Sequence, residues 1–104
     1  MPDTVSSTSM LLAAKIRVPQ HVVYRSFPSE TVLLNLQTGK YHGLNATAGR
    51  MLDALGRAEC VRDAAAALAE AYGQPQEVIE RDLCRLCASL LERGLVEADG
   101  SPAA

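Results

Sequence analysis

The stretch Glu30-Thr-Val-Leu-Leu-Asn-Leu-Gln-Thr-Gly-Lys-Tyr-His-Gly-Leu-Asn45 contains an apolar run, Thr31–Leu36, before Thr38-Gly39, and a second strand candidate after it, Lys40–Leu44 with Tyr41 and Leu44. Short runs of β-branched, aliphatic and aromatic residues that end at a glycine are typical of strands joined by a turn. Glycine suits such a turn because it adopts positive φ without steric cost. The stretch therefore predicts a β-hairpin whose turn includes Gly39.

A third strand precedes this hairpin. Residues Val22–Phe27 are rich in β-branched and aromatic side chains, and Pro28 and Ser29 separate them from the next apolar run. Three consecutive strands joined by short turns predict an antiparallel meander.

The middle strand is apolar on both of its faces. Val32, Leu34 and Leu36 alternate on one face and Leu33 points to the other. A sheet at the surface normally has one polar face, so we expect one set to pack on helices. The other set needs a cover, which an incoming peptide or the first strand could supply.

Three helical patterns follow the hairpin. In the first, Asn45 suits an N-cap, and apolar residues recur at helical spacing up to Gly56, the expected C′ residue: Ala48, Met51, Leu52 and Leu55. The second repeats this spacing up to Gly73: Val61, Ala65, Leu68 and Tyr72.

The third helical pattern is the longest. Pro75 suits its first turn, and its buried stripe comprises Ile79, Leu83, Leu86 and Leu90. If Gly94 ends this helix in a left-handed conformation, Leu95 packs back on Leu90. The order of elements predicts an α+β fold, a small winged helix-turn-helix with a three-stranded antiparallel sheet followed by three helices.

We expect one folded domain at residues 15–98, between flexible tails at 1–14 and 99–104. The chain of 104 residues has ten basic and twelve acidic residues, a net charge of -2 and no block of like charges. We therefore expect no nucleic acid as a partner. The apolar run Met10–Ala14 is too short for a signal peptide or a membrane span, and an odd set of three cysteines suits a reducing compartment. These features predict a cytoplasmic protein with no membrane partner.

The hairpin stretch closely resembles the strand-turn-strand signature of the PqqD-like family, also called RiPP recognition elements. The resemblance continues through Ala48-Gly49-Arg50-Met51, Asp82-Leu83 and Gly94-Leu95-Val96, and it covers about residues 20–97. It implies a winged fold without an active site. In that fold the leader of a precursor peptide adds as a fourth strand along the third strand and lies against the third helix. It also implies a modifying enzyme as partner, either a radical SAM enzyme of pyrroloquinoline quinone biosynthesis or the leader peptidase of a lasso peptide system.

Position in the implied fold identifies the candidate peptide-binding residues. The strand edge comprises Lys40, Tyr41, His42, Gly43 and Leu44, and the helix wall comprises Val78, Arg81, Asp82, Arg85 and Ser89. Gly43 would let the peptide backbone approach closely, and Arg81 and Arg85 would attract acidic leader residues. Main-chain hydrogen bonds provide affinity in such strand addition, and side-chain pockets provide specificity.

Other interpretations of single residues remain open. Cys84 and Cys87 have the spacing of a metal or redox pair, but their place inside a helix favours two small apolar residues near the core. His42 has no partner in a catalytic pattern, and we expect no catalytic residue, no metal and no cofactor. The alternative function is a DNA-binding winged-helix regulator, which the acidic third helix disfavours. An open edge strand also permits a homodimer.

Overall fold

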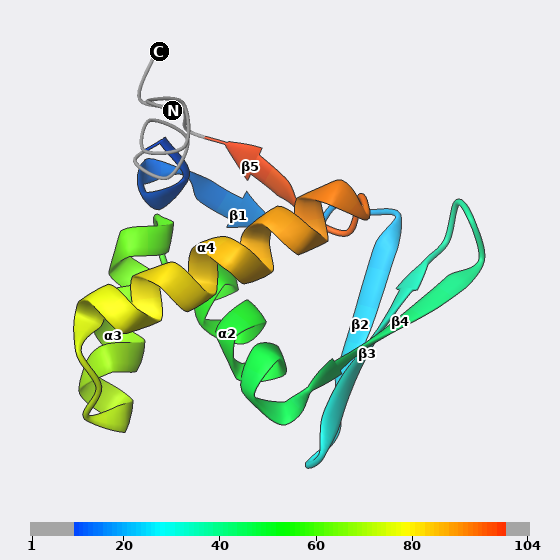
Figure 1. The fold of residues 1–104 in the computed structure, drawn as a ribbon. Coiled ribbons are helices and arrows are strands. Elements are labelled where there is room, and N and C mark those ends of the chain that lie inside the picture. The colour runs from blue at the N-terminus through cyan, green and yellow to red at the C-terminus, as the bar shows by residue number, and fades with distance from the viewer. Residues whose placement is uncertain (1–9, 100–104) are drawn as a thin grey trace.

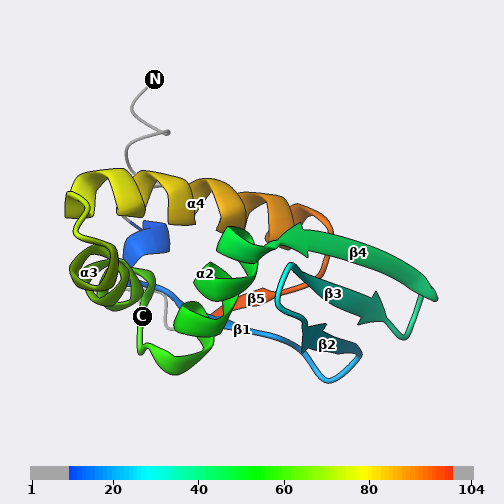
Figure 2. The ribbon, with the colours of Figure 1, turned by 90° about the horizontal axis from the view of Figure 1, so that it is seen from below.

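The computed structural model describes residues 10–99 of the chain. Its elements are β1 (Lys15–Arg17), β2 (Val22–Ser26), β3 (Glu30–Asn35), β4 (Lys40–Asn45), α2 (Ala46–Arg57), α3 (Val61–Tyr72), α4 (Gln76–Glu92) and β5 (Glu97–Asp99). The three helices pack together, and the sheet of β2, β3 and β4 projects from one end of them (Figures 1 and 2). The predicted α+β fold, with a three-stranded antiparallel sheet followed by three helices, is confirmed.

The β3–β4 hairpin forms as the sequence predicts. The Asn35 side-chain oxygen accepts hydrogen bonds from the backbone N–H groups of Gln37 at 2.9 Å and Thr38 at 3.3 Å. Gly39 then adopts a φ of 74°, and its N–H donates to the Asn35 carbonyl at 2.7 Å. Local hydrogen bonds of this kind stabilise a turn without distant contacts, so the turn was visible in the sequence.

The two faces of β3 differ in burial. Leu33 is fully buried on the helix side, together with Thr31 and Asn35, whereas Val32 and Leu34 on the other face are only half-buried. One apolar set therefore packs on the core, as predicted. Of the two covers considered for the other set, the first strand is not one, because β2 hydrogen-bonds beside β3 in the plane of the sheet.

Helix α2 begins as predicted and ends later. The Asn45 side-chain oxygen accepts a hydrogen bond from the Ala48 N–H at 2.8 Å, which confirms the N-cap. Gly56 is not the C′ residue, because the helix continues to Arg57 and Gly56 has no positive φ. Instead, the Lys15 ammonium donates to the carbonyls of Leu55, Gly56 and Ala58 at 3.4, 3.0 and 2.7 Å. The Lys15 cation therefore satisfies the last carbonyls of α2, which a glycine-ended helix satisfies with backbone N–H groups.

The other two helices end at left-handed glycines. Gly73 follows α3 with a φ of 64°, and Gly94 follows α4 with a φ of 71°. After α4, the Leu95 N–H donates to the Leu90 carbonyl at 2.9 Å, and the Gly94 N–H donates to the Leu91 carbonyl at 3.0 Å. These are the two bonds of a Schellman motif, and Leu95 is fully buried as predicted.

A second sheet was not predicted from the sequence. Strands β1 and β5 pair antiparallel, with Ile16 opposite Ala98, and the Arg17 guanidinium forms ion pairs with Glu97 and Asp99. Three-residue strands at the two ends of a domain carry too little pattern to recognise locally. The β1–β5 pair therefore depends on the tertiary structure.

The domain boundary at Lys15 was placed too late. Residues 10–13 are helical, and Leu12 and Ala14 are buried in the core at 8% and 6% exposure. The rest of the expected tails, residues 1–9 and 100–104, lies outside the described residues. At the other end, the last described residue, Asp99, which was expected in the tail, pairs with Lys15 in the β1–β5 sheet.

Candidate functional site

Strand β4 is an edge strand. The hydrogen bonds of the β2–β3 turn show which residues of β3 bond to β2 and which bond to β4, and so which backbone groups of β4 remain free. Phe27 and Glu30 exchange two backbone hydrogen bonds, of 2.7 and 3.3 Å, across the turn. Backbone groups alternate in direction along a strand, so Glu30, Val32 and Leu34 bond toward β2. The residues between them, Thr31, Leu33 and Asn35, must therefore bond toward β4.

The register of β3 with β4 shows which backbone groups of β4 point to β3 and which point to the free edge. Thr31, Leu33 and Asn35 lie opposite Leu44, His42 and Lys40 respectively. These three residues of β4 therefore direct their backbone groups inward, to β3. Tyr41 and Gly43 direct their N–H and C=O groups outward, where within the described sheet no strand pairs with them.

The predicted strand residues thus divide into two sets. Tyr41 and Gly43 offer backbone groups at the edge, and their side-chain positions lie on the face turned away from the helices. The side chains of Lys40, His42 and Leu44 point to the helix side, where Leu44 is buried at 8% exposure and His42 is half-buried. All five residues were expected to form one edge, because the direction of each backbone N–H and C=O group follows only from the register of β3 with β4.

The predicted helix residues all lie on α4 and remain accessible to different degrees. Val78, Arg81 and Arg85 are exposed, while Asp82 and Ser89 are half-buried. In both views the C-terminal half of α4 lies nearer the three-stranded sheet than its first turn does (Figures 1 and 2). Arg85 and Ser89 are therefore the members of this set closest to the sheet along α4, and Val78 is the farthest.

Strand β4 and helix α4 have different packing partners. Strand β4 packs on β3 and α2, whereas α4 packs chiefly on α3. In Figure 2, β4 is the strand drawn on the α4 side of the sheet, and β2 is drawn on the β1 side. The free edge of β4 is therefore turned toward the side of the molecule on which α4 lies.

Helix α2 lies unusually close to the sheet that carries this edge. Gly49 is buried in α2, and a Cβ atom at this position would overlap the Thr31 side chain of β3. Only a glycine permits this approach of helix and strand. The close packing of α2 on β3 therefore explains the glycine in the segment Ala48-Gly49-Arg50-Met51, which is part of the family resemblance.

The two cysteines of α4 lie at the core. Cys87 is fully buried and Cys84 is half-buried, and both are free thiols. Burial, with a smaller effect of Cys84, raises the pKa of the Cys87 thiol to about 12. Burial also raises the pKa of Cys84. Thiols that ionise only at high pH are poor nucleophiles and poor metal ligands, which favours the structural interpretation.

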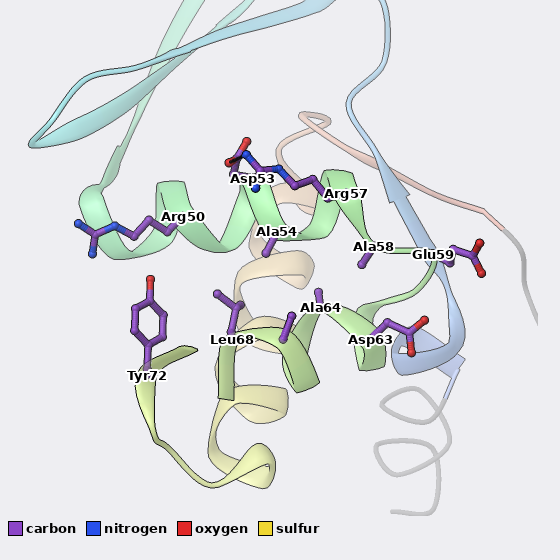
Figure 3. Close-up of a pocket in the computed structure, with 11 residues that line it drawn as sticks. Arg50, Asp53, Ala54, Arg57, Ala58, Glu59, Asp63, Ala64, Leu68 and Tyr72 are labelled. Atoms are coloured by element: carbon purple, nitrogen blue, oxygen red, sulfur yellow. Dashed lines mark ion pairs between the residues drawn. The ribbon is translucent and has the colours of Figure 1, made fainter. Parts of the chain in front are cut away.

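A hollow of about 590 Å³ lies between α2 and α3, away from the β4 edge (Figure 3). Its floor is built from small apolar side chains and Leu68. Arg50 and Tyr72 stand at one end, and Glu59 and Asp63 at the other. Asp53 and Arg57 on its rim pair with each other at 3.0 Å. The hollow combines no nucleophile with a base, so its residues suggest no chemistry.

The described residues hold no grouping typical of a metal site. Within residues 10–99, no three His, Cys, Asp or Glu side chains gather as metal ligands would. No helix in this part of the chain is both long and apolar enough to span a bilayer.

Comparison with known proteins identifies relatives of the chain. The family model described as coenzyme PQQ synthesis protein D (PqqD) matches residues 30–96. Among curated proteins, no sequence matches. One similar solved structure is TbiB1 in complex with the TbiA(beta) leader peptide, at 31% identity and a TM-score of 0.71, over 78% of this chain and 94% of that one. Another is lasso peptide synthetase B1 complexed with the leader peptide, at 28% identity and a TM-score of 0.72, over 81% and 99% of the two chains. The family match spans more than half of the chain and includes the hairpin and all three helices, so the protein belongs to the PqqD family.

Proposed function

We propose that this protein binds the leader of a ribosomally synthesised precursor peptide and presents it to a modifying enzyme, without itself catalysing a reaction. The leader adds as a fourth strand at the free edge of β4 and lies against α4. The observation that carries the proposal is the pair of outward backbone positions, Tyr41 and Gly43, in a chain similar to two proteins solved with leader peptides.

Backbone pairing supplies only part of the affinity. The N–H and C=O groups of Tyr41 and Gly43 provide four hydrogen bonds, which at a net ~0.5 to 1.5 kcal/mol each contribute about 2 to 6 kcal/mol. Micromolar binding needs about 8 kcal/mol, and ordering a flexible leader has its own cost. Two or three apolar leader side chains at ~1.5 to 3 kcal/mol each would make up the difference.

Helix α4 is the source of side-chain contacts in this proposal. Arg85 and Ser89 lie in its half nearer the sheet, and Leu86 beside them is half-buried against the core. Arg81 and Arg85 form no ion pair within the described residues, so they are available to acidic leader side chains. Val78 contacts only a leader that continues past β4 along α4.

The partner enzyme that we propose is the one whose gene lies beside this one. The resemblance implies either a radical SAM enzyme or a leader peptidase, and the descriptions of the relatives, coenzyme PQQ synthesis and lasso peptide synthetase, fit these two systems. We place this role in the cytoplasm, which is supported by the three free thiols at Cys60, Cys84 and Cys87.

A DNA-binding role has no comparable support. Helix α4, which would enter the major groove, carries four acidic residues against two basic ones: Glu77, Glu80, Asp82 and Glu92 against Arg81 and Arg85. An acidic helix is repelled by the phosphate backbone.

Nuclear magnetic resonance with amide hydrogen exchange tests the proposal. The labelled protein is titrated with the leader region of the precursor encoded beside it, and with a scrambled peptide of the same composition. In the free protein the amides of His42 and Leu44 should exchange slowly and those of Tyr41 and Gly43 quickly, because only the former bond to β3. The leader should then protect Tyr41 and Gly43.

Two results would contradict the proposed site. Protection of Tyr24 and Ser26 instead would place the peptide on β2, the opposite edge, whose outward groups belong to these residues by the same alternation. No change at high micromolar leader, with or without the partner enzyme, would reject leader binding.

A further inference from the structure

The face of the β2–β3–β4 sheet turned away from the helices is apolar and open. The register aligns two rows of side-chain positions across it, Val23–Leu34–Tyr41 and Arg25–Val32–Gly43. We call these six residues the outer face. Together with Tyr24 and Phe27, five of them line a hollow of about 610 Å³.

Large apolar side chains gather in this region. Val23 is 48% exposed and Tyr41 is 71% exposed, and Phe27 and Leu36 beside them are 49% and 56% exposed. No segment of residues 10–99 lies over them. A contiguous apolar surface of this kind on a small domain marks a binding site more often than a solvated face.

We propose that the modifying enzyme docks on the outer face and contacts the carrier and the bound leader together. This inference rests on the proposed function and names where the partner binds. The enzyme's surface would be apolar, with a carboxylate opposite Arg25. Within the described residues, Arg25 forms no ion pair.

The leader alone cannot fill this surface. Neighbouring strands lie about 4.8 Å apart, so a fourth strand beside β4 is about 14 Å from β2. Val23, Arg25 and Phe27 belong to β2 or follow it directly, beyond the reach of a side chain on the added strand. Any partner that binds that part of the face is therefore a molecule other than the leader.

The size of the outer face favours a transient partner over a second copy of the chain. Three strands at about 4.8 Å and six residues at about 3.4 Å span about 14 by 20 Å, or roughly 300 Å² in projection. A stable dimer of standard size buries about 800 Å² on each partner. A leader strand beside β4 adds about 4.8 by 20 Å, or roughly 100 Å², for an enzyme that contacts both, which still corresponds to a transient interface.

Strand β4 belongs to both the leader edge and the outer face, which explains how an enzyme distinguishes the leader-bound protein from the free protein. Tyr41 presents its backbone to the leader at the edge and its side-chain position to the outer face. Every second side chain of an added strand then extends the outer face beyond Tyr41. The docking surface is therefore complete only when the leader is bound.

Charge substitutions on β2 test this inference, because they lie far from the leader edge. Val23→Glu and Arg25→Glu change the outer face, and Tyr72→Glu is the matched control, since Tyr72 is 42% exposed on α3. Fluorescence anisotropy measures the affinity for the labelled leader region of the adjacent precursor. Calorimetry measures the affinity of the leader-loaded protein for the purified enzyme encoded beside it, and circular dichroism checks folding.

We expect both outer-face variants to bind the leader within twofold of the wild type and the enzyme at least tenfold more weakly, and the control to match the wild type in both assays. Unchanged enzyme affinity in both variants would overturn the docking site. So would an equal loss of leader affinity, or a wild-type dimer in sedimentation that Val23→Glu converts to monomer. If the wild type binds no leader, the proposed function fails, which the first assay shows separately.

Discussion

Replacement of Gly43 by proline tests strand addition by removing one backbone N–H donor at the proposed edge. Gly43 directs its N–H away from β3, so proline removes a donor that the free protein does not use within its sheet. A paired strand uses both the N–H and the C=O of this residue. Proline removes only the N–H, so the leader carbonyl opposite it is left without a donor, which weakens leader binding by about 1 to 3 kcal/mol, or about 5- to 150-fold.

Alanine at the same position is the matched control. Its Cβ would meet only the Glu30 carboxylate, at 3.9 Å, and it would lie on the outer face and not at the edge. Gly43→Ala keeps the N–H and should bind the leader within threefold of the wild type. Fluorescence anisotropy measures both affinities, and thermal unfolding by circular dichroism confirms that both variants fold. Equal affinity of a folded proline variant and the alanine variant would refute pairing at this edge.

Three further perturbations test the packing around the site. Gly49→Ala should lower the free energy of unfolding by about 1 to 3 kcal/mol, because its Cβ overlaps Thr31, and Thr31→Ala should recover part of this loss in denaturant titrations. Lys15→Met should cost about 1 to 2 kcal/mol by the same assay, since it strips the cation from the last carbonyls of α2. Burial raises the pKa of Cys87 to about 12 in the folded protein, above about 8.5 in the unfolded chain, so stability should fall as the pH rises from about 9 toward 12. Cys87→Ala should flatten that decline, and a double replacement of Cys84 and Cys87 by alanine should leave leader affinity unchanged.

Short-range signals account for the parts of the fold that were predicted correctly. The Gly39 turn, the Asn45 cap and the Gly94 ending each depend on hydrogen bonds between residues at most five apart. The one incorrect helix end, at Gly56, was decided by Lys15, more than forty positions away in the chain. A local rule fails where a distant side chain satisfies the same carbonyls.

The candidate site was only partly visible in the sequence. The hairpin sequence predicted β4 and the five candidate residues on it, and the family match over residues 30–96 confirmed the family that this sequence resembles. It did not distinguish Tyr41 and Gly43, whose backbones face outward, from Lys40, His42 and Leu44. That distinction follows from the Phe27–Glu30 bonds and the register of three strands.

The amino-acid sequence by itself determined the three strands of the meander, the three helices with their Asn45, Gly73 and Gly94 ends, and the family, because periodicity and turn chemistry act over a few residues. Only the tertiary structure decided that β1 pairs with β5, that Leu12 joins the core, and that the sheet leaves an outer apolar face uncovered. Those features depend on which distant surfaces meet. Burial of apolar surface is non-directional, so the sequence pattern shows that a face must be covered but not what covers it.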